Sequence, residues 1–97
     1  MDINFKTMKI YVQSKSELRD SRYNEGEFYR FECIDLKTKK MYYLNTSTMI
    51  PGTFRIFKNI NPGTVIDGCI IDPKYPNNIN PRSDFVIRSV EQTELLI

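Results

Sequence analysis

The sequence predicts an all-β domain of five strands, with one short helix between the third strand and the fourth. The chain of 97 residues contains no Ala, the best helix former, and it is rich in Ile, Thr, Tyr and Phe, which favour strands. Several short segments also alternate between apolar and polar residues and are separated by turn residues. A chain of this length forms one domain, which here spans residues 1–97.

The first strand is expected at 8–13, where even-numbered residues are apolar and odd-numbered residues are polar. The polar segment 14–26 is predicted as a loop with room for one helical turn. The second strand is expected at 27–36. Arg30 marks its outer face, because a buried unpaired charge costs several kcal/mol, and Phe28 lies on the same face by alternation.

A short polar turn leads from the second strand into a third strand at 41–46, so the two strands form a hairpin. We expect Met41 and Tyr43 to point inward and Tyr42 to point outward. Pro51 and Gly52 then interrupt the strand pattern.

A short helix is predicted at 53–60, because Phe54 and Phe57 recur at a spacing of three residues and Thr53 could cap its start. The Ile and Phe residues of this segment also suit a strand, which stays open as the alternative. The Pro-Gly turn that follows begins a fourth strand at 64–71. Gly68 lies inside that strand and indicates a bulge or a sharp bend.

The last part of the chain is expected to hold a long loop, one strand and a tail. The segment 72–84 is rich in Pro and Asn, which favours an exposed loop. The fifth strand is expected at 85–91, and 92–97 form the tail.

Several classes of chemistry are disfavoured by composition. The chain has no His, which is the most frequent general base and metal ligand. Cys33 and Cys69 are too few for a four-thiolate zinc site, and both are expected to be buried, reduced thiols. The triplet Asp35-Leu36-Lys37 has the acid-x-Lys spacing of a class of metal-dependent nucleases, but a suitable upstream acid and a supporting helix are missing. We therefore expect no enzyme activity, no cofactor and no metal.

The chain carries a net charge of +2, and residues 1–60 are mildly basic while residues 61–97 are mildly acidic. A basic first half suits a polyanionic partner, although solvated surface charge has the same composition. No segment approaches the roughly 18 apolar residues that span a bilayer, and the N-terminus lacks the apolar core of a secretory signal. We expect a cytoplasmic protein without membrane contact.

The order of elements over residues 8–91 resembles that of an OB fold, a five-stranded Greek-key barrel. The segment 57–66, which reads Phe-Lys-Asn-Ile-Asn-Pro-Gly-Thr-Val-Ile, resembles the junction where an apolar helix end closes the barrel and a Pro-Gly turn starts the fourth strand. Through the aromatic and basic hairpin at 27–46, the chain most resembles the small single-stranded-DNA-binding proteins of phages and mobile elements. This resemblance implies binding of a single strand, DNA more than RNA, during replication or transfer of such an element.

The residues themselves support a nucleic-acid-binding face, because aromatic and basic side chains interleave on the expected outer surface. Cations contact phosphates, and flat rings stack on unpaired bases. The candidates on the strands and hairpin are Lys9, Tyr11, Phe28, Arg30, Lys39, Lys40 and Tyr42. The two flanking loops add Arg19, Arg22, Tyr23, Lys74, Tyr75 and Arg82.

Two alternatives stay open. Any single ring could belong to the core of a small β domain, and the loop cations could be merely solvated. The exposed rings could also form a protein interface, as in a phage-encoded modulator of a host enzyme. We further expect a homodimer or higher oligomer, because one small site offers few phosphate contacts. The apolar ending at 95–97 could pack across the subunit boundary or fold back on its own barrel.

Overall fold

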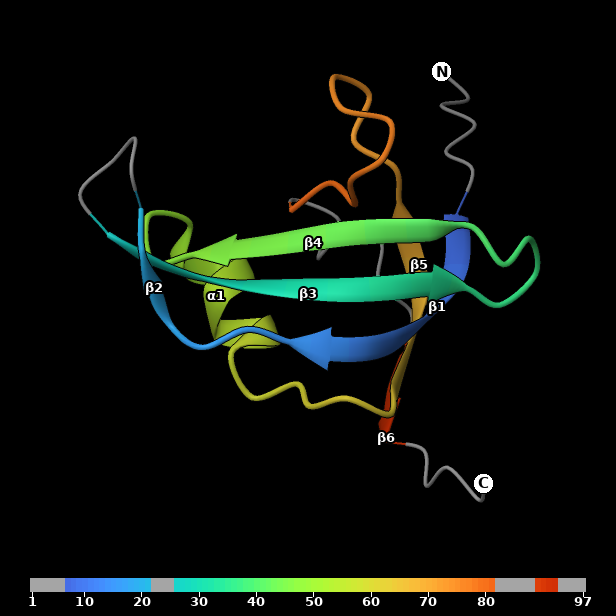
Figure 1. Cartoon of the computed structure of the whole chain (residues 1–97), viewed down its shortest axis with the longest axis horizontal. Coiled ribbons are helices and arrows are strands. Elements are labelled where there is room, and N and C mark those ends of the chain that lie inside the picture. The colour runs from blue at the N-terminus through green and yellow to red at the C-terminus, as the bar shows by residue number, and fades with distance from the viewer. Residues whose placement is uncertain (1–6, 22–25, 82–88, 93–97) are drawn as a thin grey trace.

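The computed structural model describes residues 7–21, 26–81 and 89–92, and this part of the chain is mostly β-structure (Figure 1). The five main strands are β1 (Thr7–Lys15), β3 (Glu27–Asp35), β4 (Met41–Ser47), β5 (Thr64–Ile70) and β6 (Ser89–Gln92). A two-residue strand, β2 (Arg19–Asp20), and one short helix, α1 (Pro51–Phe57), complete the elements. The prediction of a β domain with a helix between the third and fourth main strands is confirmed.

The strands form one antiparallel sheet in which β3 lies between β4 and β1, and β5 lies between β1 and β6. The short β2 pairs with the start of β3. Figure 1 shows β5 running steeply behind β3 and β4, so the sheet curls around one side. In the described part of the chain the sheet is open between β4 and β6.

The element bounds differ from the sequence-based expectations in a few places. β1 runs two residues further than expected, and β2 lies inside the segment predicted as a loop. The fifth strand is present at 89–92, whereas 85–88 lie outside the described residues. Helix α1 begins earlier, at Pro51, a residue suited to the first helical position because its missing N–H needs no partner there.

Thr53 does not cap the helix, contrary to the prediction. Ile50 occupies the capping position, and no side chain makes a capping hydrogen bond. Thr53 is buried inside the helix, and its hydroxyl donates a hydrogen bond to the carbonyl of Pro81. The residue therefore ties α1 to the long loop that follows β5.

The bulge predicted at Gly68 is present. Met8 lies opposite Cys69 and Lys9 lies opposite Asp67, so Gly68 has no partner in β1. Its φ of 97° lies in the left-handed region that favours glycine. Such a bulge bends the strand and increases its twist, which helps the sheet to curl.

A second bulge occurs at Gln13 in β1, where the sequence has no glycine that would indicate a bulge. Val12 lies opposite Cys33 and Ser14 lies opposite Glu32, so Gln13 is the extra residue. The bulge reverses the alternation of the strand. As a result Lys15 lies opposite the buried Phe31.

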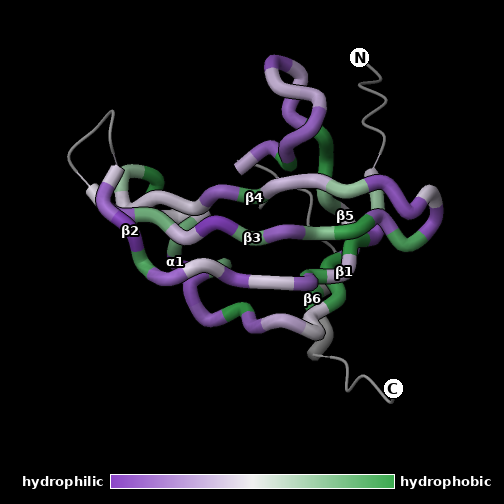
Figure 2. Tube along the Cα trace, viewed as in Figure 1, coloured by the Kyte–Doolittle hydropathy of each residue, from purple (hydrophilic) through white to green (hydrophobic). Residues whose placement is uncertain are grey.

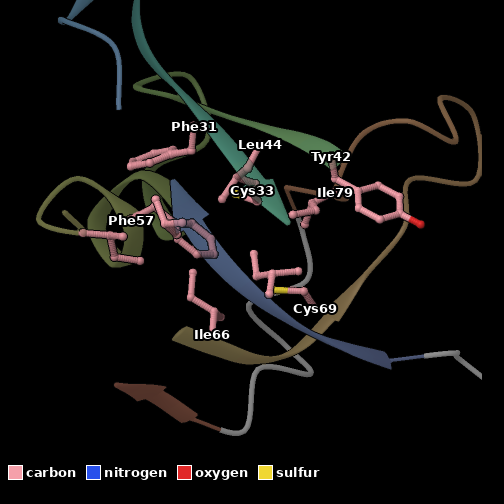
Figure 3. Packing of buried hydrophobic residues seen from close by; sticks show 11 residues of the cluster. Phe31, Cys33, Tyr42, Leu44, Phe57, Ile66, Cys69 and Ile79 are labelled. Carbon is pink, nitrogen blue, oxygen red and sulfur yellow. The ribbon is translucent and has the colours of Figure 1, made fainter. Parts of the chain in front are cut away.

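The core is formed by apolar side chains from β1, β3, β4, β5 and α1, together with the loop residue Ile79 (Figure 3). Phe31 and Phe57 are the largest fully buried side chains. Cys33 and Cys69 are also buried and are free thiols, as predicted. Figure 2 shows hydrophilic and hydrophobic residues following one another along β3, in keeping with one buried face and one outer face.

The orientation predicted for the third main strand is wrong. Tyr42 is only 5% exposed and belongs to the core, together with Leu44 and Thr46, whereas Tyr43 points to the outer face. The reason is the pairing with β3, because directly opposite residues share a face of the sheet. Tyr42 lies opposite Cys33, a buried residue. In Figure 3 its hydroxyl oxygen points away from the core cluster.

Within the described ranges, the structure has no helix with the length and apolar character needed to cross a membrane.

Candidate nucleic-acid interface

The centre of the candidate site is a stacked pair, Arg30 and Tyr43, on neighbouring strands. Both residues belong to the outer face, which we define as the side of β1, β3 and β4 that points away from the core. Arg30 lies opposite Asn45, and Tyr43 lies opposite Glu32, so the two side chains are diagonal neighbours. The Arg30 guanidinium carbon is 4.2 Å from the centre of the Tyr43 ring. At this distance the cation is attracted to the ring face.

A concave surface of about 380 Å³ lies beside this pair, which we call the basic hollow. The described residues that line it include Ser14, Lys15, Arg19, Arg30, Glu32 and Tyr43. Among these described residues, the cationic side chains of Lys15, Arg19 and Arg30 outnumber the one carboxylate, that of Glu32. The hollow therefore has the charge and the flat ring that a nucleic-acid strand requires.

Ser16 fixes the position of Arg30 by bonding to its backbone in both directions. The Ser16 N–H donates to the carbonyl of Arg30 at 2.8 Å, and the Arg30 N–H donates to the Ser16 hydroxyl oxygen at 2.9 Å. Beyond Ser16 the chain enters β2, which places Arg19 opposite Phe28. The backbone thus brings Arg19 to the same end of the sheet as Arg30.

Lys15 lines the hollow, but its ammonium group is held by the helix. Its Nζ donates a hydrogen bond of 2.7 Å to the carbonyl of Lys58, at the C-terminal end of α1, where a positive charge is favourable. The same Nζ is 4.5 Å from the centre of the Tyr29 ring. We therefore regard Arg19 and Arg30 as the cations that serve a ligand in this hollow.

A second hollow of about 310 Å³, which we call the loop hollow, lies between β4 and the loop that follows β5. Its described lining comprises Asn45, Asp72, Tyr75, Asn78, Ile79 and Pro81. Asn45, which lines the loop hollow, lies opposite Arg30, which lines the basic hollow, so the two hollows have neighbouring lining residues on β3 and β4.

The loop that forms this second hollow is tied to the sheet by its backbone. Tyr43 donates its N–H to the carbonyl of Asn77 at 3.0 Å, and Ile79 donates its N–H to the carbonyl of Tyr43 at 2.8 Å. A further bond of 2.9 Å joins Asn80 to Ile70. Because Tyr43 also stacks on Arg30, one residue connects the loop with the basic hollow.

Some of the predicted site residues are brought together on the outer face, and others are not. Lys9 and Tyr11 lie on β1, and Phe28 and Arg30 lie on β3, all with the predicted outward orientation. Tyr42 is buried, which removes it from the site.

The remaining candidates lie in turns and loops. Lys39 and Lys40 are exposed at the tip of the β3–β4 hairpin, where Lys39 has a φ of 65°. The exposed Lys74 has its Nζ 5.6 Å from the centre of the Tyr75 ring. Arg22, Tyr23 and Arg82 lie outside the described residues.

Tyr43 and Asn45 were missed by the sequence analysis. The signal that could have found them is the hairpin register, since Arg30 and Glu32 are clearly outward and their cross-strand partners must share that face. Pairing the residues of the two strands outward from the hairpin turn would have placed Tyr43 opposite Glu32 and Asn45 opposite Arg30.

The triplet Asp35-Leu36-Lys37 has a structural role. Asp35 is buried, and one carboxylate oxygen accepts hydrogen bonds from the N–H groups of Lys37 at 2.8 Å and Thr38 at 3.3 Å. These bonds hold the hairpin turn, as aspartate does in many turns. In the parts of the chain that are described, no three His, Cys, Asp or Glu side chains gather in a way that could hold a metal ion.

The two thiols are poor nucleophiles in this fold. Burial is the main cause that raises the pKa of Cys69 to about 12, with a further contribution from the charge of Asp67. Burial also raises the pKa of Cys33, and the neighbouring Cys69 and Glu32 add to this effect. Both thiols therefore stay protonated near neutral pH.

Comparisons with protein-family models, with curated proteins and with solved structures find no match for this chain. The case for a function is thus built on the geometry of the outer face.

Proposed function

We propose that this protein binds single-stranded nucleic acid, DNA in preference to RNA, across the outer face of β3 and β4, and that it does so without catalysis. The observation that carries the proposal is the Arg30–Tyr43 stack at the edge of a basic hollow. Phosphates are attracted to the guanidinium groups of Arg30 and Arg19. Unpaired bases stack on an outward ring such as Tyr43 or Phe28, each base contributing roughly 1–3 kcal/mol.

The arrangement of strands is compatible with an OB-like barrel, which forms part of the proposal. A closed barrel in the order β1–β3–β4–β6–β5 needs each strand to pair with the next, and the described residues supply every pair except β4 with β6. In OB folds the ligand crosses the second and third strands, between two loops. The corresponding strands here are β3 and β4. The basic hollow takes Arg30 and Glu32 from β3 and Tyr43 from β4, and the loop hollow takes Asn45 from β4.

The proposal is tested by fluorescence anisotropy with labelled single-stranded and duplex oligonucleotides of one sequence. We expect the single strand to bind more tightly, with an affinity that falls linearly in the logarithm of salt concentration, by about 0.7 log units per neutralised phosphate. Replacing Tyr43 with Leu should weaken binding by about 1–3 kcal/mol if a base stacks on its ring. Replacing it with Phe should preserve most of the affinity.

Two further variants divide the charge effect from the stacking effect. Arg30→Gln should weaken binding and also flatten the salt dependence, whereas Phe28→Ala should weaken binding and leave the salt dependence unchanged. Arg55→Gln is the matched control, because Arg55 is exposed on α1, away from the outer face. If Arg30→Gln and Arg55→Gln behave alike, or if the wild-type protein does not bind the single strand, the proposal is wrong.

A second candidate function is a protein-interaction module, such as a modulator of a host enzyme. The observation that favours it is an apolar area at the turn end of the hairpin. Met41 is 43% exposed there and lies opposite the half-buried Ile34, with Leu36 37% exposed nearby. A protein partner held by this area would bind with little dependence on salt, and Met41→Lys would abolish its binding.

The role in replication or transfer of a phage or mobile element, and the assembly into a homo-oligomer, belong to the same proposal. The apolar ending at 95–97, on which the oligomer prediction depends, lies outside the described residues. Sedimentation at micromolar concentration tests the assembly. A monomer that still binds tightly would show that linked sites are not needed.

A further inference from the structure

We propose that the loop hollow is a nucleobase pocket that prefers bases with an exocyclic amine, namely cytosine, adenine and guanine, over uracil and thymine. This inference rests on the proposed function, and it adds a preference among bases that the Arg30–Tyr43 stack alone would not create. The juxtaposition that carries it is a carboxylate and two side-chain amides around one hollow at the edge of β4.

When one base of a strand stacks on Tyr43, the loop hollow is placed to receive the neighbouring base of the same strand. Asn45 lies opposite Arg30 on the neighbouring strand. Asn78 pairs with Tyr43 through an isolated parallel β-bridge of the backbone. A strand that crosses the outer face from Arg30 to Asn45 therefore reaches the loop hollow. The volume of about 310 Å³ is at the small end for ligand sites and suits one flat ring system.

The strongest hydrogen-bond acceptor in this hollow is the carboxylate of Asp72. One of its oxygens accepts the N–H of Lys74 at 2.8 Å, which fixes the side chain, and a carboxylate accepts several hydrogen bonds at once. The nearby backbone carbonyls of Tyr75, Asn77 and Asn78 already accept hydrogen bonds within the loop or from β4. A base that enters the hollow therefore meets the Asp72 carboxylate as its main acceptor.

An acceptor of this kind distinguishes amines from carbonyls. Cytosine and adenine carry an amine beside a ring nitrogen, and guanine carries an amine beside a ring N–H, so each offers a donor to the carboxylate. The side-chain amides of Asn45 and Asn78 can donate to the ring nitrogens or the carbonyl of the same bases. Uracil and thymine exchange both groups, because they place a carbonyl oxygen where cytosine has its amine and a ring N–H where cytosine has an acceptor nitrogen. In the position that suits cytosine, the carbonyl oxygen faces the Asp72 carboxylate and the ring N–H faces an amide donor, so neither hydrogen bond forms.

The same loop supplies a stacking surface and a cation. Tyr75 is 55% exposed, so its ring can lie against a base at the mouth of the hollow. The ammonium of Lys74 lies 5.6 Å from the centre of that ring. Its positive charge offsets the negative charge of Asp72, which reduces the repulsion between this carboxylate and a phosphate of the strand. A carboxylate can therefore serve in this place without repelling the strand as a whole.

The experiment compares short oligo-dC and oligo-dU of equal length at neutral pH, using the complete chain. The two strands share the same backbone and the same ring size. Their bases differ in the exocyclic group, an amine in cytosine and a carbonyl in uracil, and in the neighbouring ring nitrogen, which accepts in cytosine and donates in uracil. We expect oligo-dC to bind about tenfold more tightly than oligo-dU, the effect of one hydrogen bond to a charged group. In Asp72→Asn the two affinities should agree to about twofold, since an amide can donate as well as accept.

The control is Glu27→Gln, which removes an exposed carboxylate at the start of β3 and should keep the preference for oligo-dC. Equal binding of the two strands by the wild-type protein, or a preference that survives in Asp72→Asn, would overturn this inference while leaving the proposed function intact. Absence of binding to both strands would instead refute the proposed function, and this inference with it.

Discussion

Thr46 offers a sharp test of the core packing, because its hydroxyl is buried with no hydrogen-bond partner among the described residues. The side chain is 0% exposed, in β4 opposite Tyr29. Burying a hydroxyl without a partner costs about 1–3 kcal/mol by mutational measures. Valine has almost the same shape, keeps the branched side chain that suits a strand, and does not carry this cost. We therefore expect Thr46→Val to raise the free energy of unfolding by about 1 kcal/mol.

Thr53 is the matched control, since it is equally buried but donates its hydroxyl to the carbonyl of Pro81. Thr53→Val removes that bond. It should lower the free energy of unfolding by about 1–2 kcal/mol. The same substitution is thus expected to have opposite signs at two buried threonines.

Urea denaturation monitored by tyrosine fluorescence measures both changes, and thermal denaturation gives a second estimate. For a domain of this size, about 1 kcal/mol shifts the melting temperature by roughly 4–8 °C. If Thr46→Val destabilises the protein as much as Thr53→Val does, the Thr46 hydroxyl has a partner, such as a buried water molecule, and the reasoning fails.

Two further predictions concern stability. Gly26→Ala should lower the free energy of unfolding by about 1–3 kcal/mol. Gly26 has a φ of 143°, and an added Cβ would lie 2.9 Å from the Thr48 hydroxyl oxygen. An unchanged midpoint of urea denaturation would contradict this prediction. The contribution of the Cys69 thiol to stability should be constant below pH 8 and should fall between the ordinary thiol pKa of 9.0 and about 12, since the folded state keeps the Cys69 proton that the unfolded chain releases. The double variant Cys33→Ser, Cys69→Ser should lose that part of the decline, and an identical pH profile in both proteins would refute the assignment.

The orientation of β1 and β3 could be predicted from the sequence because one phase of each strand is clearly apolar or clearly charged. In β3, Arg30 and Glu32 can only be outward. In β4 both phases contain apolar residues, since Met41 and Tyr43 alternate with Tyr42 and Leu44. Alternation alone cannot distinguish the two phases there, and the pairing with β3 decides it.

Of the two bulges, one could be predicted from the sequence and the other could not. The bulge at Gly68 could be predicted from the sequence, because a glycine inside a strand often marks a bulge or a bend. The bulge at Gln13 has no such signal, and it depends on how β1 pairs with β3. The loop hollow could not be predicted either, because the loop is positioned by backbone bonds to Tyr43 that composition does not reveal.

The unpredicted bulge also decides which cations serve the outer face. Without it, Lys15 would continue the alternation that places Lys9 and Tyr11 outside, and it would add its charge to the basic hollow. With it, Lys15 turns towards the core side and binds the end of α1 through the carbonyl of Lys58. The local charge then rests on Arg19 and Arg30, with Glu32 opposing them. The two arginines that the described residues place at this hollow give weak binding to a bare phosphate chain by themselves, and stacking on Tyr43 and Phe28 is expected to supply much of the affinity there.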